Sequence, residues 1–285
     1  MNIAVVGGNG FIGKEFVNYA SSKGHLVFVI GSEYNVYDDY GENTVKSILK
    51  KCDAMVFLAA KRHVSTFSME DYLYNIRIAD KYLSLSVETS VKNVVVTSSI
   101  SVYSNNVIPW RETDFQAPLS LYGASKQAVD SLALFYNEQQ GMKIKSLRLA
   151  QVIGLGERKG FLLNTIIDKA IAKEKQTVYG KGLGRRQYIY IKDVCDAILH
   201  AVTKECDSSG IFNIGMEYNV AIADLVQMVN EVFDNDAGVG FLLDKSEDMN
   251  EYLMDVSKIE REFKWKPQYD LRSAFMDIKK QCLES

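Results

Sequence analysis

The sequence predicts an α/β protein with a doubly wound parallel sheet, followed by a smaller α/β part at the C-terminal end. In the first half, short apolar runs alternate with amphipathic stretches of helical length, the pattern of strand–helix–strand units and a parallel sheet. After Leu149 this rhythm loosens, and glycines mark loops at Gly154, Gly156 and Gly160. We therefore expect one part over residues 1–155 and a second over 156–285, between which the chain can pass more than once.

The composition is that of a soluble globular chain and excludes several classes of protein. The 285 residues include 33 basic and 36 acidic side chains, giving a net charge of −3, and 47% are hydrophobic. Such a chain does not hold nucleic acid by bulk charge, and no stretch reaches the roughly 18 apolar residues that span a bilayer. The N-terminus lacks the pattern of a secretion signal. Only three histidines and four scattered cysteines argue against a metal site or a disulfide framework and favour a reducing cytoplasm: Cys52, Cys195, Cys206 and Cys282.

The first part is expected to alternate strands and helices. Strands at Asn2–Val6 and Leu26–Ile30 flank a helix at Phe11–Ser22, which ends before Gly24. The next segment, 31–51, is short and polar, so we expect a loop there in place of the usual second helix. Three buried strands then alternate with two long amphipathic helices: strands Ala54–Leu58, Val94–Thr97 and Ile144–Leu149, and helices Glu70–Thr89 and Tyr122–Gln140.

The second part shows shorter elements. From Asp234 onward the chain is polar, and we expect it to be irregular until a C-terminal helix. Before that point the pattern predicts a helix at Phe161–Lys173, a strand at Thr177–Tyr179, a helix after Asp193, a strand at Ile211–Ile214 and a helix at Ile222–Phe233.

A glycine-rich turn, Gly7-Gly8-Asn9-Gly10-Phe11-Ile12-Gly13, follows the first strand and opens the first helix. Glycines at its first, fourth and seventh positions allow a tight turn, close approach of a pyrophosphate and close packing of the helix on the sheet. The helix N-terminus presents free N–H groups to the phosphates. Such turns also occur by chance without a ligand, but the strand–turn–helix context favours a dinucleotide site.

Tyr122 and Lys126 stand four residues apart at the start of an expected helix, so both side chains lie on one face. A lysine cation beside a phenol lowers the pKa of the phenol, which can then exchange a proton with a substrate hydroxyl near neutral pH. A Tyr–Lys pair on the surface would give the same pattern, so the spacing alone is a weak indication.

Serines Ser98 and Ser99 end the strand at Val94–Thr97. In open parallel sheets, ligands bind at the carboxyl ends of the strands. A serine hydroxyl there can hydrogen-bond the same oxygen as the tyrosine, although capping of the next segment is the commoner role of a single serine.

These three motifs, in this order, resemble the extended short-chain dehydrogenase/reductases, in particular the nucleotide-sugar epimerase/dehydratase family. The resemblance implies a Rossmann-type dinucleotide-binding part at 1–155 and a mainly nucleotide-sugar-binding part at 156–285. It makes Tyr122 the acid/base, Lys126 its pKa partner and ribose ligand, and Ser99 the hydroxyl that positions the reacting oxygen. Tyr122 and Lys126 would share the cofactor site with Gly7, Gly10, Phe11, Ile12, Gly13, Asp38, Ala59 and Ala60.

Stretches of the second half resemble the family's sugar-nucleotide contacts. Arg148-Leu-Ala-Gln151 is similar to an RxxN motif of the family. The stretch Arg186–Asp193 is similar to a family motif whose arginine binds the diphosphate of the sugar nucleotide. A guanidinium fork suits phosphate oxygens, although an interdomain ion pair would also explain such an arginine. The implied substrate-binding residues are Ser99, Gln151, Arg186 and Lys245.

Three departures from the family pattern bear on the cofactor and the reaction. Gly31-Ser32 stand where NAD-preferring members carry a carboxylate for the adenosine ribose, and no arginine follows directly, so the choice between NAD and NADP stays open. Ile100 and Ser101 replace the Asp-Glu pair of the 4,6-dehydratases, which disfavours elimination of water. Gln151 replaces an asparagine and extends the amide by one methylene.

The resemblance implies NAD(P)-dependent oxidoreduction at a ring carbon of a nucleotide sugar, with carbon 4 as the expected position. An epimerase similar to UDP-glucose 4-epimerase would oxidise this carbon and reduce it from the other face, whereas a 4-keto-sugar reductase would need external NAD(P)H. A 4,6-dehydratase and a non-catalytic dinucleotide sensor are less favoured alternatives. Family members often pair through two helices of each subunit, so the resemblance implies a homodimer. From the composition we expect a cytoplasmic protein without a nucleic-acid or membrane partner.

Overall fold

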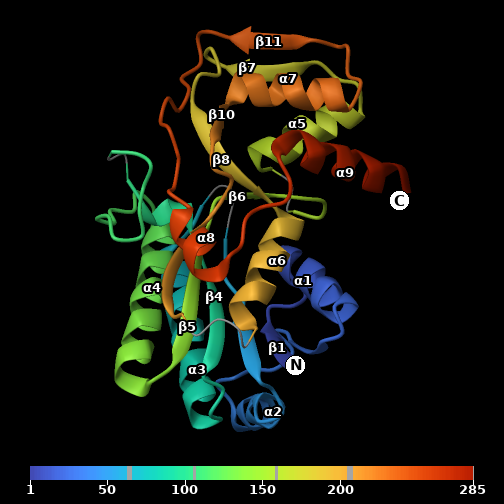
Figure 1. Ribbon diagram of the computed structural model, residues 1–285. Coiled ribbons are helices and arrows are strands. Elements are labelled where there is room, and N and C mark those ends of the chain that lie inside the picture. Colours follow the sequence, from blue (N-terminus) through green and yellow to red (C-terminus); the bar gives the residue numbers. More distant parts are fainter. Residues whose placement is uncertain (63–65, 105–106, 158–159, 204–207, 285) are drawn as a thin grey trace.

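The computed structural model describes residues 1–284, apart from 63–65, 105–106, 158–159 and 204–207. Its larger part contains a parallel sheet of six strands in the order β2-β1-β3-β4-β5-β9 (Figure 1). Since β2 and β3 lie on opposite sides of β1, the winding of the chain reverses next to β1, and ligands bind at such a switch point. The strands are β1 (Asn2–Val6), β2 (Leu26–Ile30), β3 (Ala54–Phe57), β4 (Asn93–Ser99), β5 (Lys143–Leu149) and β9 (Gly210–Ile214).

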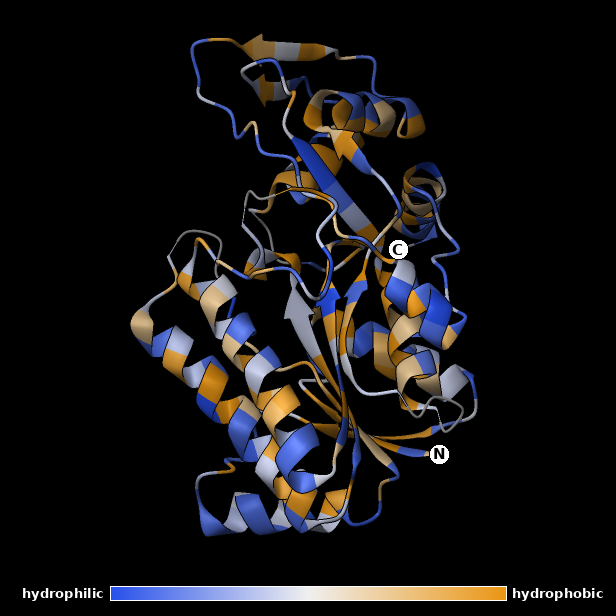
Figure 2. Ribbon diagram, turned by 60° about the vertical axis from the view of Figure 1, so that its left-hand side comes forward, coloured by the Kyte–Doolittle hydropathy of each residue, from blue (hydrophilic) through white to orange (hydrophobic). Residues whose placement is uncertain are grey.

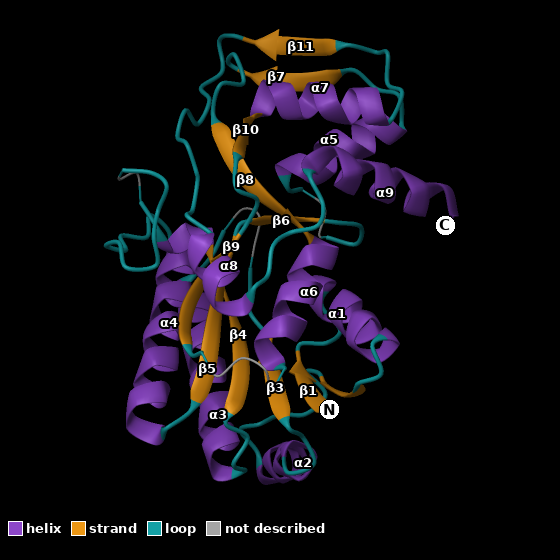
Figure 3. Cartoon of the chain, in the orientation of Figure 1, coloured by secondary structure: helices purple, strands orange, loops and turns teal. Residues whose placement is uncertain are grey.

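Helices cover both faces of this sheet (Figure 3). α3 (Met69–Glu88) and α4 (Leu121–Gln140) pack side by side on one face, and α1 (Phe11–Ser22) and α6 (Ile191–Val202) pack together on the other. Alternate residues of β1 therefore enter different cores: Ile3 and Val5 join one buried cluster, Ala4 and Val6 the other. Most residues of these strands are apolar for this reason, whereas the helices carry both polar and apolar residues (Figure 2).

The expectation of a loop over residues 31–51 was wrong, because this segment contains helix α2 (Asp39–Leu49). Only Gly41, Val45 and Leu49 of this helix are buried, so its apolar face is narrow and its composition is polar. Asp38 caps the helix, its carboxylate accepting a hydrogen bond from the N–H of Gly41 at 2.8 Å.

The smaller part contains two short sheets, with strand orders β10-β8-β6 and β11-β7. The strands are β6 (Gln151–Ile153), β7 (Gln176–Tyr179), β8 (Arg185–Tyr190), β10 (Asn219–Ala221) and β11 (Val239–Leu242). Helices α5 (Leu162–Ile171), α7 (Ile222–Val232) and α9 (Leu271–Glu284) pack around them.

Two elements correct the expectation of an irregular chain after Asp234. β11 forms parallel pairs with β7, and α8 (Ser257–Phe263) packs on β9 of the large sheet. Phe263 of α8 meets Phe212 of β9 edge-on, with ring centres 4.7 Å apart. β11 is only four residues long, and α8 carries only two apolar residues, Ile259 and Phe263, so tertiary pairing rather than local pattern defines both elements. The helix expected after Asp193 begins at Ile191, which places Asp193 in its first turn.

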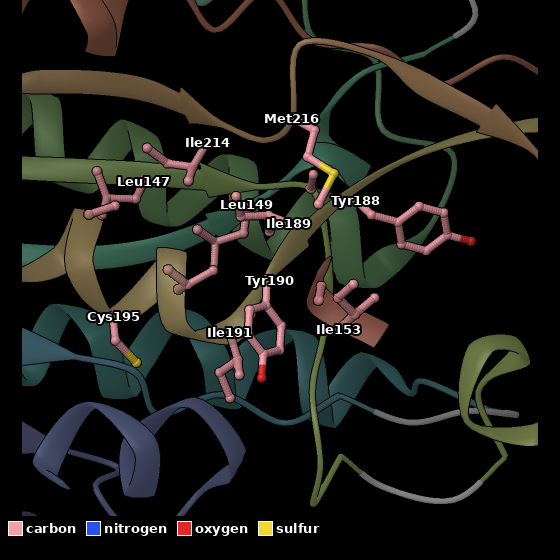
Figure 4. Packing of buried hydrophobic residues seen from close by; sticks show 14 of the residues in the cluster. Leu147, Leu149, Ile153, Tyr188, Ile189, Tyr190, Ile191, Cys195, Ile214 and Met216 are labelled. Carbon is pink, nitrogen blue, oxygen red and sulfur yellow. The ribbon is translucent and has the colours of Figure 1, made fainter. Parts of the chain in front are cut away.

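One buried cluster joins the two parts of the molecule. It extends from Ile3 of β1 through Leu149 of β5 and Tyr190 of β8 to Leu225 of α7. Figure 4 shows its centre, where side chains of β5, β6, β8, β9 and α6 meet. Cys52, Cys195 and Cys282 are free thiols, and Cys206 lies outside the described residues. No helix in the described part of the chain is long and apolar enough to cross a membrane, and no cluster of metal-ligating side chains occurs there.

Candidate active site

A cavity of about 710 Å³ lies at the carboxyl ends of β1, β3, β4 and β5, facing the smaller part. It is bounded by the glycine-rich turn on one side and by Arg186 of β8 on another. All of the residues predicted from the sequence to form the site line this cavity, except Asp38, Ala59 and Lys245. The structure thus gathers residues that are up to 179 positions apart in the sequence, from Gly7 to Arg186.

The glycine-rich turn fits a pyrophosphate. Gly7 has a φ of +82°, and a β-carbon on Gly13 would overlap the carbonyl oxygen of Gly7, so neither position accepts a side chain without strain. Gly10, the N-cap residue of α1, makes no side-chain cap. The N–H groups of the first turn of α1 have no partner within the helix and form part of the cavity wall, where they suit the phosphates of a dinucleotide.

Tyr122 lies in the first turn of α4, whose N-cap Ser120 accepts a hydrogen bond from Gly123. The edge of Phe67 meets its ring with centres 5.7 Å apart. Burial raises the pKa of the Tyr122 phenol, whereas the Arg62 cation and the hydrogen bond with Ser99 act in the opposite direction. The assignment of Lys126 as the pKa partner of Tyr122 stays a prediction, and Arg62 is a second cation close enough to lower the pKa of the phenol.

The side chain of Lys126 is buried, and only 4% of the residue is exposed to solvent. Its Nζ donates a hydrogen bond to the carbonyl of Thr97 at 2.8 Å and lies 5.9 Å from the centre of the Tyr122 ring. Burial lowers the pKa of Lys126 to about 8, an effect that the nearby carboxylate of Asp130 opposes. The two side chains therefore meet the same cavity, as their four-residue spacing predicted.

Ser99 and Ser98 occupy different environments, because neighbouring residues of a strand point to opposite faces. Ser99 contacts the Tyr122 hydroxyl, and its Oγ also accepts a hydrogen bond from the N–H of Ser101 at 3.2 Å. The Ser98 hydroxyl is buried without a hydrogen-bond partner among the described residues. Of the two, only Ser99 has a described contact with the phenol.

Arg62 and Glu157 also line the cavity, and the sequence analysis did not identify them. They form an ion pair with an N···O distance of 2.9 Å, and the Arg62 guanidinium stacks 4.0 Å from the centre of the Phe161 ring. Burial raises the pKa of Glu157. The pair joins the segment after β3 to the segment after β6. The pair of basic residues Lys61-Arg62, which follows Ala59-Ala60 after β3, was the signal that could have indicated Arg62.

Arg186 is fixed at the far end of the cavity by three groups. Its guanidinium pairs with Asp248 at 2.6 Å, donates to the carbonyl of Asn250 at 2.8 Å and lies 4.5 Å from the centre of the Tyr252 ring. Gln151 is exposed at the cavity wall. A guanidinium held in this way presents its charge in one place, as recognition of a diphosphate requires.

Three predicted residues do not line the cavity. Asp38 uses its carboxylate to cap α2, as described above. Ala59 packs by its backbone, since a β-carbon on Gly7 would lie 2.9 Å from its nitrogen. Lys245 is exposed beyond β11, where its N–H donates to the carbonyl of Leu242. The roles predicted for Asp38 in cofactor binding and for Lys245 in substrate binding stay predictions, since the described cavity does not include these residues.

Comparison with known protein families identifies the family to which the chain belongs. A model of the NAD-dependent epimerase/dehydratase family matches residues 3–215. The chain belongs to this family. The expected membership of the extended short-chain dehydrogenase/reductases and the Rossmann-type sheet are thereby confirmed.

Family members with different reactions are similar to the chain. UDP-glucuronic acid decarboxylase 1 of Arabidopsis thaliana is 24% identical over 296 residues, covering 95% of this chain and 67% of that protein. The structure of UDP-N-acetylglucosamine 4-epimerase from Bacillus cereus has a TM-score of 0.88 at 26% identity, covering 99% and 96% of the two chains. That of the UDP-glucose 4-epimerase of Thermus thermophilus in complex with NAD has a TM-score of 0.83 at 20% identity, covering 98% of each chain. The relatives share a nucleotide-sugar class of substrate in their names but not one reaction.

Proposed function

We propose that the protein is an NAD(P)-dependent sugar-nucleotide 4-epimerase, which oxidises carbon 4 of a nucleotide-linked sugar and reduces it again from the opposite face. The observation that carries this proposal is the convergence of Ser99, Tyr122 and Lys126 on a cavity that has a pyrophosphate-binding turn at one side and Arg186 at another.

The cavity residues divide the chemistry as follows. A dinucleotide held at the glycine-rich turn from Gly7 to Gly13 would supply the capacity for hydride transfer. Tyr122 takes the proton of the sugar hydroxyl as the carbon is oxidised and returns a proton when the ketone is reduced. Ser99, in contact with the phenol, donates a hydrogen bond to the same oxygen. Lys126 is fixed by its hydrogen bond to the Thr97 carbonyl, and its Nζ lies close to the Tyr122 ring.

Inversion at carbon 4 requires the keto sugar to turn first one face and then the other toward the cofactor while its diphosphate stays bound. In this proposal Arg186 holds the diphosphate, and the sugar turns about the bonds that join it to the phosphates. A cavity of about 710 Å³ is within the usual range of small-molecule sites, and its lining includes both Tyr122 and Arg186.

Elimination of water is less well supported than epimerisation. Ile100 is buried and apolar, and Ser101 carries a hydroxyl, so neither offers a proton-transferring carboxylate. Two carboxylates do line the cavity, but Glu157 pairs with Arg62 and Asp248 pairs with Arg186. A 4-keto-sugar reductase uses the same three residues as the epimerase and is the alternative that the test must separate.

The test is incubation of the purified protein with UDP-, GDP- and dTDP-sugars, with and without added NADH or NADPH. Conversion to the 4-epimer without added reductant supports the epimerase. Turnover of a 4-keto sugar that depends strictly on the reductant assigns the reductase in its place. If no nucleotide sugar is converted or raises the thermal unfolding temperature, the nucleotide-sugar assignment is wrong.

We also propose that two copies pair through the outer face of α3 and α4. Large apolar side chains are exposed on both helices, among them Leu73 and Tyr74 on α3 and Leu134 and Phe135 on α4. Because these helices pack side by side on one face of the sheet, their apolar residues can form a shared surface.

A further inference from the structure

Arg62 and Glu157 meet in the cavity from different parts of the molecule. Arg62 follows β3 of the large sheet, and Glu157 follows β6 of the smaller part. Their side chains form an ion pair with an N···O distance of 2.9 Å. Both residues line the cavity that also contains Tyr122, so this pair joins the two parts of the molecule at the wall of the candidate active site.

Two partners of the Arg62 guanidinium are themselves held in place. The Glu157 carboxylate accepts a hydrogen bond from Asn164 of α5, and the Glu157 side chain is only 8% exposed. The Phe161 ring, whose centre is 4.0 Å from the guanidinium, belongs to the N-cap residue of α5. The Arg62 side chain itself is 44% exposed, and a long side chain at such a position keeps its rotamer freedom unless fixed partners restrict it.

The position of this guanidinium matters because it acts on Tyr122. The Arg62 cation lowers the pKa of the phenol, and such an effect weakens as the distance between the two groups grows. Among the described residues, the other charged side chains of the cavity are Lys126 on α4 and the Arg186–Asp248 pair. A displacement of Arg62 therefore changes the charge that the phenol meets, even where the backbone keeps its place.

We propose that Glu157 is a positioning residue, whose carboxylate holds the Arg62 guanidinium close to Tyr122 and so strengthens the effect of this cation on proton transfer. The competing role is neutralisation, in which the carboxylate weakens the same effect by cancelling the charge of Arg62. The two roles give opposite signs when the carboxylate is removed, so one measurement separates them. The inference rests on the proposed acid/base role of Tyr122.

The pH profile of kcat tests the effect on proton transfer. Glu157→Ala should move the acidic limb to higher pH by about 0.5 to 1 pH unit, less than the effect of a cation in direct contact with an acid. In an Arg62→Gln background, Glu157→Ala should add no further shift. Phe161→Leu keeps both charges but loses the stacking ring, so it should move the limb in the same direction. Glu231→Ala, which removes a carboxylate paired with Arg272 on the surface, should leave the limb unchanged. A limb that moves to lower pH in Glu157→Ala, or keeps its native midpoint, overturns the inference.

Nitrogen-15 NMR of the arginine side chains tests the anchoring of Arg62 without turnover. A guanidinium held by a carboxylate and a ring rotates slowly, so Arg62 should give separate Nη signals, which are identified by their absence in Arg62→Gln. These signals should merge in Glu157→Ala, and the inference is wrong if they stay separate there. If the signals merge but the native protein converts no nucleotide sugar, the proposed function is refuted while Glu157 is still shown to hold Arg62.

Discussion

Lys126 Nζ lies 5.9 Å from the centre of the Tyr122 ring and is fixed there by a 2.8 Å hydrogen bond to the Thr97 carbonyl. The two side chains are one turn apart on α4, and Thr97 belongs to β4. The position of the amine relative to the ring therefore depends on the packing of α4 against β4.

Removal of the Tyr122 hydroxyl should abolish most of the activity. With Tyr122→Phe, we expect turnover of the nucleotide sugar to fall about 10²- to 10⁴-fold, the usual contribution of a general acid/base. Tyr136→Phe removes a hydroxyl from the same helix, where it donates to Asp80 outside the cavity, and should keep turnover near the native value. If Tyr122→Phe stays within about threefold of the native rate, the acid/base role is wrong.

Lys126 should make the protein less stable below about pH 8 than above it. The pKa of this buried amine is about 8 in the folded protein and 10.5 in its ordinary state, so at pH 7 it is charged in both states and its burial costs roughly 3 kcal/mol. Between pH 8 and 10.5 the folded protein loses this proton first, and the cost falls toward zero.

The measurement is urea unfolding of the native protein and of Lys126→Met at pH 7 and pH 10. Loss of the hydrogen bond to Thr97 opposes the gain from removing the charge, so the change with pH is the informative quantity. The free energy of unfolding of Lys126→Met, relative to the native protein, should fall as the pH rises. Lys280→Met, at an exposed pair with Glu284, should show no such trend, and an equal trend in both variants would contradict the prediction.

Loss of the Arg62 charge should shift the pH dependence of oxidation upward. Arg62 lowers the pKa of Tyr122, and the phenol must be deprotonated to accept a proton, so Arg62→Gln should move the acidic limb of the kcat profile to higher pH. Arg62→Lys keeps the positive charge and should restore most of the native profile. A purely structural role would lower kcat in Arg62→Gln without moving its midpoint.

Arg186 should contribute mainly to binding of the nucleotide sugar. Arg186→Ala is expected to raise KM about 10- to 100-fold with a smaller change in kcat, because a charged hydrogen bond to phosphate acts in both the ground state and the transition state. Arg272→Ala removes an arginine that pairs with Glu231 on the surface and should leave KM unchanged. A native KM in Arg186→Ala would show that the diphosphate is held elsewhere.

A charge on the outer face of α4 should prevent pairing of two copies. Phe135 is 55% exposed, so Phe135→Glu is expected to leave the fold intact and to convert a dimer into a monomer. Light scattering after size-exclusion chromatography gives the mass of each species. Tyr40→Glu, at an exposed aromatic residue of α2, should keep the native mass, and a native protein that is already monomeric would refute the proposed interface.

Local patterns in the chain were enough to predict most strands, the glycine-rich turn and the joint position of Tyr122 and Lys126. Strands that are buried on both faces are largely apolar, and a spacing of four residues places two side chains on one side of a helix wherever that helix lies. These properties depend on neighbours within a few residues, so they are visible without the fold. Helix α2 was missed because only Gly41, Val45 and Leu49 of this polar segment face the interior.

The contacts that give the cavity its charge depend on the folded chain. Arg62 meets Glu157 across 95 positions, and Arg186 meets Asp248 across 62. Such pairings follow from which strand ends the sheet order brings to one edge, and residue spacing along the chain carries no information about that distance.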